Sequence, residues 1–407
     1  MNFPFFVARR YFLSKRKRNF INIISILSMV GIAFSTAALV IVLSVFNGLE
    51  DLLRSLNNSF DPEIKIELVK GKTFEADEKL ISTIKSTEGV DIVTEVLEDY
   101  GYLRYRDADM VITMKGVSDN FLDQHRIDKS IIEGKLRFRD SLGQYAIIGR
   151  GIRYQLSVVV GESLYPLQVY YIKNAKTSTV DPSKLYSVAG IQPGAEFSIE
   201  KNVDESYVLL PIEFVRNLTG YGNRCTSLEV KINSASDLQK VKAAILHQLG
   251  KDYSVLTNDE QHKELYKLVK IEKLFTFVSM ALLTVVASIN IFFSLMMLAI
   301  EKKKDISILM AMGSQKSTIN TIFLSEGALI AFTGAISGLL LGALTCWAQD
   351  QFGLIGMGME SAIVNAYPVK IKWIDFISIG SVIVMITFLT SFYPARLASR
   401  SYSTAQL

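Results

Sequence analysis

Four long runs without a charged residue constrain this chain more than any other feature of its sequence. They cover residues 19–49, 274–300, 327–349 and 376–395, with lengths of 31, 27, 23 and 20 residues. A helix of about 20 apolar residues crosses the hydrocarbon core of a bilayer, so each run predicts a transmembrane helix. The first run exceeds the ~7–15 apolar residues of a secretory signal, and no small-residue cleavage site follows it. We therefore interpret it as a retained signal anchor.

The composition agrees with a soluble domain joined to membrane spans. Hydrophobic residues make up 49% of the 407 residues, which is high for a soluble protein, while charged residues still make up 21%. The net charge of +4 gives no electrostatic support for nucleic-acid binding, so nucleic acid is not expected as a partner.

Basic residues beside the runs predict the orientation of the spans. Arg9, Arg10 and residues 15–18 precede the first run, Lys302, Lys303, Lys304 and Lys316 separate the second and third, and Arg396 and Arg400 follow the fourth. With four spans these groups share one side, which the positive-inside rule makes cytoplasmic. The predicted fold class is a membrane α-helical protein with four transmembrane helices, cytoplasmic N and C termini, and a large α+β domain outside, between helices 1 and 2.

The predicted segments follow from these runs and flanks. They are a basic cytoplasmic segment at 1–18, transmembrane helix 1 at 19–48, the outer domain with a helical stalk at both ends at 49–272, transmembrane helix 2 at 273–300, a cytoplasmic loop with a short helix at 301–316, transmembrane helix 3 at 317–349, a short outer loop at 350–373, transmembrane helix 4 at 374–396, and a cytoplasmic tail at 397–407.

Two leucine-rich stretches beside the first two runs predict the stalk. Apolar residues recur there at helical spacing, which places them on one face of each helix. The residues are Leu49, Leu52, Leu53 and Leu56 on the way out, and Leu265, Leu268 and Val269 on the return. We interpret the stretches as helices that leave the membrane and pair with each other; two separate surface helices at the base of the domain are the alternative. Between them, short β-rich runs and two stretches of helical spacing predict an α+β domain of two subdomains.

The sequence contains no pattern typical of catalysis or of a metal site. The three histidines have no ligand spacing with carboxylates or cysteines, and no nucleophile motif is present. We expect no enzyme activity and no catalytic, cofactor-binding or metal-binding residue. Within the third span, Gly334, Gly338 and Gly342 recur every four residues, which predicts a smooth face for close helix packing. Glu326, near the start of that span, either extends to the headgroups or makes a buried contact in the bundle.

The polar loop between the second and third runs predicts a short amphipathic helix. Its apolar residues line one side, Asp305 suits the positive N-terminal end, and Gly313 can end the helix in a left-handed conformation. The helix residues are Asp305, Ile306, Leu309, Met310, Met312 and Gly313. Either the helix anchors to anionic lipid through its lysines, or it fits a socket on a cytoplasmic partner.

Several stretches resemble one family of permeases. The segment "EKKKDISILMAMGSQKSTINTIFLSEG" is similar to the coupling segment of FtsX-like and MacB-like ABC-transporter permeases, with matches that include Glu301 and Glu326. The N-terminal stretch up to "SVFNGLE", with its Asn47-Gly48 pair, resembles the lipoprotein-releasing (Lol) permeases in particular. "IIGRGIRYQLSVVVGESL" and "YPARLAS" resemble further parts of the same family, in the same order.

The resemblance implies partners, location and mechanism. It implies a bacterial inner-membrane protein with its large domain in the periplasm, and a dimer with an identical or paralogous permease. A separate cytoplasmic ABC ATPase, which holds the ATP and magnesium, would bind the coupling helix, with Glu301 and Glu326 linking that helix to the bundle. Movement of the outer domains would extract a lipoprotein from membrane lipids and hand it to a periplasmic carrier. A protruding loop can dock that carrier, and its candidate residues here are Lys173, Lys176, Asp181, Pro182 and Lys184.

Other functions stay open on the sequence. The alternatives are a MacB-like export permease for macrolides or peptides, an FtsX-like signal relay that activates cell-wall hydrolases, and a membrane-anchored enzyme, for which the sequence offers no constellation of catalytic residues.

Overall fold

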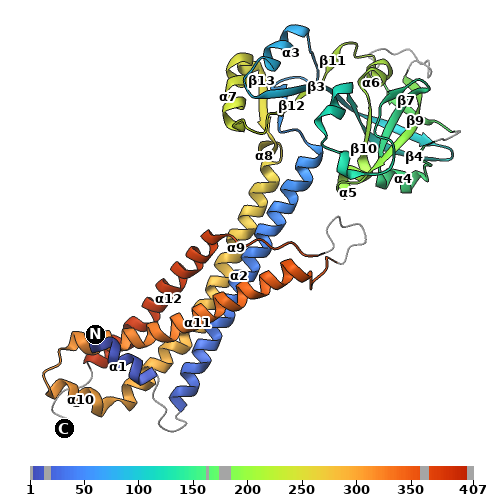
Figure 1. Cartoon of the computed structure of the whole chain (residues 1–407). Helices are drawn as coiled ribbons and strands as arrows, with labels where there is room; N and C mark the ends of the chain where they lie inside the picture. Colours follow the sequence, from blue (N-terminus) through green and yellow to red (C-terminus); the bar gives the residue numbers. More distant parts are fainter. Residues whose placement is uncertain (1–2, 13–19, 162–164, 174–184, 358–365, 401–407) are drawn as a thin grey trace. The chain divides into compact units, whose positions relative to one another are not determined.

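The computed structural model describes residues 3–12, 20–161, 165–173, 185–357 and 366–400 (Figure 1). Contacts divide the chain into two compact units. The helical unit is Met1–Leu52, Lys267–Gly358 and Val364–Leu407, and the sheet unit is Leu53–Tyr266 with Met359–Ile363. Each unit is considered by itself below.

In the described part of the chain, six helices contribute to the helical unit. Their bounds are α1 Phe3–Phe12, α2 Phe20–Phe60, α9 Lys263–Glu301, α10 Lys303–Ala311, α11 Lys316–Phe352 and α12 Trp373–Arg400. Within the described residues, α2, α9, α11 and α12 are long and apolar enough to cross a membrane. The four predicted apolar helices are therefore confirmed. The helix α2 runs unbroken beyond Leu52 to Phe60, and α9 begins at Lys263, before the segment of the helical unit that starts at Lys267.

The long helices are apolar on all sides, as membrane-spanning helices are. Leu39, Ile291 and Ile330 are buried in the shared core, while Phe34 and Phe388 are exposed on the outside. A helix that is hydrophobic all round is typical of a lipid environment. Several hydroxyl side chains bond to their own helix: Ser28 and Thr387 each donate to the carbonyl four residues earlier, so their polar atoms are satisfied where water is absent.

Three glycines of α11 lie against the backbone of α2. A Cβ atom built on Gly334 would lie 2.7 Å from the Met29 carbonyl oxygen, and a Cβ on Gly342 would lie 3.0 Å from that of Ala37. Gly338, between them, lies against the carbonyl of Ala33. Only a residue without a side chain permits this approach, so the four-residue glycine spacing determines which face of α11 packs on α2.

The first half of the sheet unit is a four-stranded sheet with two helices. The elements are β1 Ile64–Leu68, α3 Glu78–Lys85, β3 Val90–Tyr105, β12 Ser227–Ile232, α7 Leu238–Leu249 and β13 Tyr253–Thr257. The strand order is β13-β1-β12-β3, and all three pairings are antiparallel. This is the split βαβ arrangement of ferredoxin-like folds. The core beneath the helices includes Ile64, Ile66, Ile84, Leu228 and Ile245.

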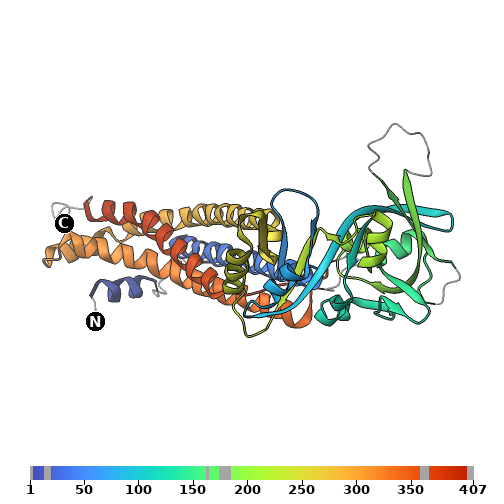
Figure 2. The ribbon, with the colours of Figure 1, turned by 90° about the horizontal axis from the view of Figure 1, so that it is seen from above.

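The second half is inserted between β3 and β12 and forms a closed ring of strands. Its strands are β4 Ala108–Val117, β5 Ile131–Gly134, β6 Arg139–Asp140, β7 Gly143–Gly149, β8 Leu167–Ile172, β9 Tyr186–Phe197 and β10 Tyr207–Pro211. Hydrogen bonds connect β3, β4, β10, β7, β9 and β8, and β8 pairs again with β3, so the ring closes. The long β3–β4 hairpin can be followed in both views (Figure 1; Figure 2).

Short helices and a small strand pair complete the sheet unit. Their bounds are β2 Phe74–Glu75 paired with β11 Arg224–Cys225, the 3-10 helices η1 Asp119–Gln124, η2 Asp128–Ser130 and η4 Gly250–Asp252, and the α-helices α4 Arg150–Leu156, α5 Lys201–Ser206, α6 Ile212–Thr219 and α8 Asn258–Gln261. The α4 and α6 helices contribute Ile152 and Val215 to the core around the ring. The prediction of an α+β domain between the first two long helices is confirmed.

Candidate coupling site and helix attachments

The short helix α10 joins α9 to α11. Its backbone hydrogen bonds begin directly after α9: the Lys302 N–H donates to the Leu298 carbonyl (2.9 Å), and the Ile306 N–H donates to that of Lys302 (2.9 Å). Asp305 lies in its first turn, 3.6 Å from the Lys302 ammonium group. After α10, Gly313 has a φ of 92°, which a glycine adopts without strain, and α11 begins three residues later. Few residues therefore separate α10 from either long helix.

The apolar residues of α10 do not all lie on one side. Ile306 is buried in the bundle core, and Leu309 and Met310 pack against that core. Ile308 is 50% exposed, and Met312, which follows the last helical residue, is 78% exposed. The prediction of a single stripe that includes Met312 is therefore wrong, because the stripe at i, i+3 and i+4 faces the bundle. The large exposed apolar side chains of this segment are those of Ile308 and Met312.

The N-terminal helix α1 packs beside this segment. Ala8 of α1 is fully buried in the bundle core, and the Lys302 ammonium group lies 5.3 Å from the centre of the Tyr11 ring. Burial raises the pKa of Tyr11 to about 12, and the carboxylates of Asp305 and then Glu326 add to the effect. Tyr11 therefore stays uncharged at neutral pH and serves as a packing surface for Lys302.

The two predicted linking glutamates differ in their surroundings. Glu326 of α11 is buried in the bundle, and its Oε2 atom has no hydrogen-bond partner within the described part of the chain. Glu301, the last residue of α9, is exposed. In this chain Glu326 faces the bundle interior and does not extend to the surface. The role of either glutamate in coupling stays a prediction.

A buried asparagine connects three elements of the helical unit. The Asn47 amide nitrogen donates to the Lys370 carbonyl (3.1 Å) and to the Asp375 carboxylate (2.6 Å), while its oxygen accepts from the Lys273 ammonium group (2.7 Å). Lys273 also lies 3.5 Å from Asp375. Asn47, Lys273 and Asp375, which come from α2, α9 and α12, are called the Asn47 clamp below. An amide suits this position because it both donates and accepts.

The segment before α12 lies directly against the same stretch of α2. A Cβ on Gly48 would overlap the Pro368 carbonyl, so only glycine fits there. The Lys370 N–H donates to the Ser44 carbonyl (2.9 Å), its side chain bonds to Asp51, and Lys372 lies 3.5 Å from Glu50. The Asn47-Gly48 pair thus makes one attachment: the amide supplies the hydrogen bonds, and the glycine permits the close approach.

In the sheet unit, the last residue of α2 is held by a buried cluster of charges. The Phe60 carbonyl accepts from the Arg126 guanidinium (3.0 Å), and the Lys115 ammonium lies 4.3 Å from the centre of the Phe60 ring. Lys115 is 2.8 Å from Glu229, and Arg126 also pairs with Glu229. Phe60, Lys115, Arg126 and Glu229 are called the Phe60 socket below. Because Lys115 is on β4 and Glu229 is on β12, the socket joins the helix end to both halves of the sheet unit.

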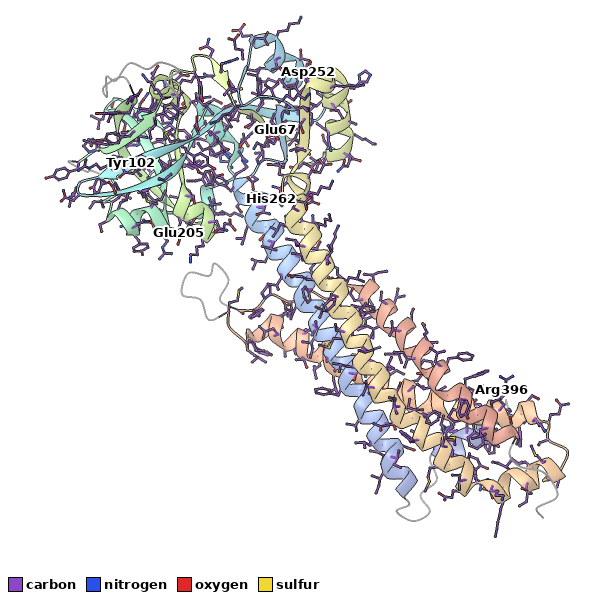
Figure 3. The ribbon with its side chains drawn as sticks, turned by 180° about the vertical axis from the view of Figure 1, so that it is seen from behind. Glu67, Tyr102, Glu205, Asp252, His262 and Arg396 are labelled. Carbon is purple, nitrogen blue, oxygen red and sulfur yellow. The ribbon has the colours of Figure 1, made fainter. Side chains whose placement is uncertain are left out.

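Three further pairs within the sheet unit hold the end of α2 to α8 and the beginning of α9. Asn57 donates to the Tyr266 hydroxyl (3.0 Å), and Arg54 donates to both oxygens of Asp259. One nitrogen of His262 lies 2.7 Å from an Asp61 oxygen, and the His262 side chain is visible in Figure 3. The two helices are therefore paired here by polar groups.

The predicted stalk leucines pack only in part. On α2, Leu52, Leu53 and Leu56 are half-buried, and Leu49 is also partly exposed. On α9, Leu265 is exposed and Leu268 is 59% exposed, whereas the predicted Val269 is half-buried and Tyr266, which was not predicted, is buried. The packed face of α9 therefore contains Val269, as predicted, together with Tyr266, and it excludes Leu265 and Leu268. The search for aliphatic residues at helical spacing did not include Tyr266, because tyrosine carries a hydroxyl group. That hydroxyl can be buried here because Asn57 donates a hydrogen bond to it.

The predicted carrier-docking loop begins at the end of the β8–β9 hairpin. The Lys173 N–H donates to the Leu185 carbonyl (2.8 Å), so the two strands stay paired up to these residues. Below them the Tyr171 hydroxyl donates to Asp99 (3.0 Å), which also bonds to Lys72 (2.5 Å). Lys176, Asp181, Pro182 and Lys184 lie outside the described residues. The structure thus fixes the base of the loop, and its function stays a prediction.

Comparison with known proteins gives matches along the whole chain. The model of the MacB-like periplasmic core domain matches residues 25–248, more than half of the chain, and that of the FtsX-like permease C-terminal matches residues 277–402. The lipoprotein-releasing system transmembrane protein LolC of Buchnera aphidicola is 25% identical, with 97% of this chain and 96% of the relative covered. LolE of Haemophilus influenzae is 24% identical, with 98% of both covered. An uncharacterized ABC transporter permease of Methanocaldococcus jannaschii is 24% identical, with 91% and 90% covered.

Four membrane-length helices and an α+β domain between the first two of them define a multi-span permease with a large extramembrane domain. This chain belongs to the family with the MacB-like periplasmic core domain and the FtsX-like permease C-terminal region. The predicted resemblance and the predicted inner-membrane location with a periplasmic domain are both confirmed.

Proposed function

We propose that this chain is a permease subunit of an ATP-driven ABC transporter that extracts lipoproteins from the inner membrane and passes them to a periplasmic carrier. The observation that carries this proposal is the match to LolC and LolE over nearly the full length of both chains, which includes the periplasmic domain and all four long helices. Matches confined to the membrane helices would support only the broader class of FtsX-like permeases.

The proposed orientation places α10 and both termini in the cytoplasm. There α10 would bind a separate ABC ATPase, and ATP and magnesium would be held by that subunit. Ile308 and Met312 supply an exposed apolar surface at the connection of two long helices. Because α2 and α9 continue as unbroken helices beyond the helical unit, ATP-driven movement at α10 can be transmitted as displacement of whole helices. This is the mechanical form of transport that we propose.

The remaining partners follow from the same proposal. A second permease, identical or paralogous, would complete the membrane assembly, and lipoprotein acyl chains would enter from the surrounding lipid beside α2 and α9. The loop that begins after Lys173 would dock the periplasmic carrier. Lys173 and Leu185, paired at its base, would hold it at the end of a rigid hairpin.

Reconstitution tests the transport function. The permease, its ATPase and a triacylated lipoprotein are placed in proteoliposomes with the soluble carrier, and lipoprotein in the soluble fraction is measured with and without ATP. ATP-dependent transfer to the carrier is the expected result. If no lipoprotein moves, and instead a macrolide is exported or a cell-wall hydrolase copurifies from native membranes, the lipoprotein function is wrong and a MacB-like or FtsX-like role replaces it.

A pair of matched substitutions tests the coupling surface. Ile308→Asp should weaken association with the ATPase at least ~10-fold, or about 1.4 kcal/mol, because a carboxylate replaces an exposed apolar contact. Ile132→Asp, an equally exposed isoleucine on β5, is the control and should leave association unchanged. Copurification of the ATPase measures the effect. Unchanged association of the Ile308 variant would contradict the assignment of α10.

A further inference from the structure

The helix α1 carries aromatic and basic side chains on the side that faces away from the bundle. Ala8 is fully buried in the bundle core, and Tyr11 packs against that core. On the other side lie five residues, called the α1 outer face below. They are Phe3, Phe5 and Phe6, which are 48%, 49% and 43% exposed, and Arg9 and Arg10, which are also exposed. One short helix therefore has one face for the bundle and another for its surroundings.

Aromatic rings and guanidinium groups alternate around the α1 outer face. At about 100° per residue, the order around the helix is Phe5, Arg9, Phe6, Arg10 and Phe3. Such a face suits the boundary of a membrane. There apolar rings can enter the acyl region, while long basic side chains extend to the phosphate groups.

The position of α1 along the bundle coincides with the ends of the charge-free runs. The ring of Tyr11 lies beside Lys302, two residues after the run 274–300 ends. The carboxylate of Glu326, directly before the run 327–349, also lies near Tyr11. Figure 1 shows α1 next to α11 at this end of the bundle. Because charge-free runs occupy the hydrocarbon core, a helix at their ends lies in the headgroup region.

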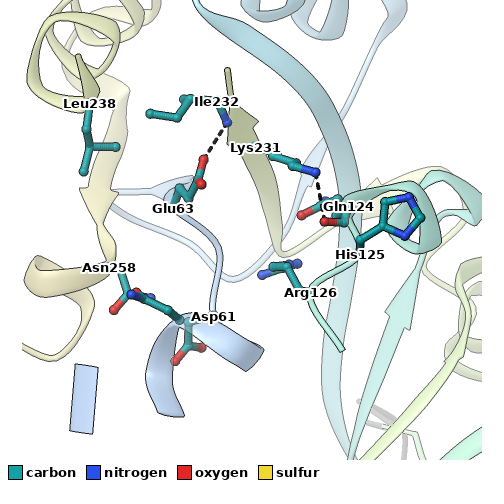
Figure 4. A pocket seen from close by; sticks show the side chains of 10 residues that line it. Asp61, Glu63, Gln124, His125, Arg126, Lys231, Ile232, Leu238 and Asn258 are labelled. Carbon is teal, nitrogen blue, oxygen red and sulfur yellow. Dashed lines mark hydrogen bonds between the residues drawn. The ribbon is translucent and has the colours of Figure 1, made fainter. Parts of the chain in front are cut away.

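The two arginines of α1 are available to an anion from outside the protein. Neither guanidinium forms an ion pair with a carboxylate of the described residues. The basic groups of a pocket of about 410 Å³ in the sheet unit differ in this respect (Figure 4). There Lys231 donates to the Gln124 carbonyl (3.0 Å), and Arg126 pairs with Glu229. The cations of the pocket are therefore engaged within the protein, whereas those of the α1 outer face are not.

We propose that the α1 outer face binds anionic phospholipid, with Arg9 and Arg10 paired to lipid phosphates and the phenylalanine rings beside the upper part of the acyl chains. A guanidinium pairs with a phosphate through two parallel N–H···O bonds, which favours arginine at such a site. Each basic residue near an anionic surface strengthens binding about 5-fold, so two should give a preference of at least ~10-fold. This site is distinct from the exposed pair Ile308 and Met312, and lipid binding here does not depend on lipoprotein transport.

A single tryptophan on the α1 outer face tests whether this face meets lipid. Phe6→Trp is made in the full-length protein together with Trp347→Phe and Trp373→Phe, because the chain has two tryptophans. The protein is placed in phosphatidylcholine vesicles brominated near the headgroup end of the acyl chains, and quenching of the fluorescence is measured. We expect quenching of the same order as in Phe388→Trp, on the exposed side of α12, and much stronger than in Tyr154→Trp, at an exposed residue of the sheet unit.

The same reporter measures lipid selection at this one place. A constant minor fraction of brominated lipid is added, either phosphatidylglycerol or phosphatidylcholine, and the two quenching strengths are compared. We expect a preference of at least ~10-fold for phosphatidylglycerol, which Arg9→Gln with Arg10→Gln should lower to below ~2-fold. Arg9→Lys with Arg10→Lys retains the charge and should retain most of the preference. Arg139→Gln with Arg224→Gln, at exposed arginines of the sheet unit, is the matched control and should change nothing.

Salt and competitors identify the bound group without a substitution of the arginines. The preference for phosphatidylglycerol should shrink as chloride is raised, because salt screens exposed charges. Inorganic phosphate at constant ionic strength should not reduce it, since free phosphate has no acyl chains. Addition of the ABC ATPase should leave the Phe6→Trp protein quenched.

Several results would overturn the proposal. They are weak quenching by brominated phosphatidylcholine, equal quenching by the two lipids, an unchanged preference after the paired glutamine substitutions, and a preference that salt does not alter. Loss of the preference on addition of phosphate would make this a site for a free anion, and loss of quenching on addition of the ATPase would make it a protein contact. Because lipoprotein transfer is a separate readout, failure here leaves the proposed function standing.

Discussion

The Asn47 clamp and the Phe60 socket both hold the helix α2, but they do so with different chemistry. In the socket, the side chains of Lys115 and Glu229 are each only 2% exposed. In the clamp, those of Lys273 and Asp375 are 25% and 13% exposed, and the neighbouring pair of Lys370 and Asp51 is still more open. The clamp is centred on a neutral amide, whereas the socket is built from full charges.

This difference indicates which attachment can open. A charge that loses its partner inside a protein stays desolvated, so separating the groups of the socket is costly. Pairs near water exchange a partner for solvent at little cost, typically below ~1 kcal/mol. We infer that the socket holds the helix end permanently to the sheet unit, while the clamp can release the segment before α12 during a transport cycle.

The largest effect is expected from the socket. Glu229→Gln removes the carboxylate that lies 2.8 Å from Lys115 and also pairs with Arg126, while Glu98 stays 3.5 Å from Lys115. It should destabilise the sheet unit by about 3–5 kcal/mol, because two buried positive groups lose the carboxylate that they share. Hydrogen exchange of the β12 amides, followed by mass spectrometry, measures it.

The control for this variant is Glu67→Gln on the neighbouring strand β1. Its pair with Lys65 is partly exposed, so the change should cost less than ~1 kcal/mol. The double variant Lys115→Met with Glu229→Leu should recover part of the loss, since it removes the buried ammonium group together with the carboxylate and leaves only Arg126 without its partner. Equal protection of β12 in the Glu229→Gln variant and the wild type would show that the charges do not hold the unit.

The pH dependence of stability sharpens the same comparison. Burial alone would raise the pKa of Glu229, but the charges of Arg126 and Lys115 outweigh it and hold that pKa at about 2, below the ordinary value of 4.5. A lowered carboxyl pKa stabilises the folded state above the ordinary value, and this stabilisation is lost as the pH falls from 4.5 toward 2. The free energy of unfolding of the wild type should therefore fall across this pH interval, and it should fall less in the Glu229→Gln variant. If both proteins lose the same free energy of unfolding per pH unit, Glu229 is excluded as the cause.

A smaller effect is expected at the clamp. Asn47→Leu removes three hydrogen bonds but leaves Lys273 beside Asp375, so the helical unit should lose about 1–3 kcal/mol. The indole of Trp373, two residues before Asp375, can report the change in a Trp347→Phe background. Asn290→Leu, at a half-buried asparagine of α9 outside the clamp, is the control. If Asn47→Leu lowered the free energy of unfolding as much as Glu229→Gln does, the inference that the clamp is weaker than the socket would be wrong.

The smallest effect is expected from Lys372→Gln. Its pair with Glu50 is long, at 3.5 Å, and Lys372 is partly exposed, so the loss should be below ~1 kcal/mol and should shrink further at high salt. Thermal unfolding at two ionic strengths measures it. A larger, salt-independent loss would mean that the segment before α12 is held as firmly as the socket.

Some features were readable from the sequence because they repeat locally. Charge-free length predicts the four helices, and the four-residue spacing of Gly334, Gly338 and Gly342 marks a packing face without knowledge of the partner. The turn at Gly313 is likewise a local property. Such signals lie within one element, so they do not depend on the tertiary fold.

The attachments could not be predicted because they join residues far apart in the chain. Asn47 meets Lys273 and Asp375 more than two hundred residues later, and no spacing rule connects them. Lys115 and Glu229 look like ordinary strand residues until the pairing of β3 with β4 and β12 brings them together. The unusual Asn47-Gly48 pair at the end of an apolar run was a signal, but it did not identify its contacts.

The glycine contact between α11 and α2 restricts how these helices can slide. Gly334, Gly338 and Gly342 face the carbonyls of Met29, Ala33 and Ala37, so both helices repeat every four residues along the contact. A shift of α2 by a fraction of that repeat would bring side chains onto the glycine backbone. The next equivalent position lies four residues away, about 6 Å along the axis. The contact therefore favours sliding of α2 along α11 in shifts of four residues over continuous sliding.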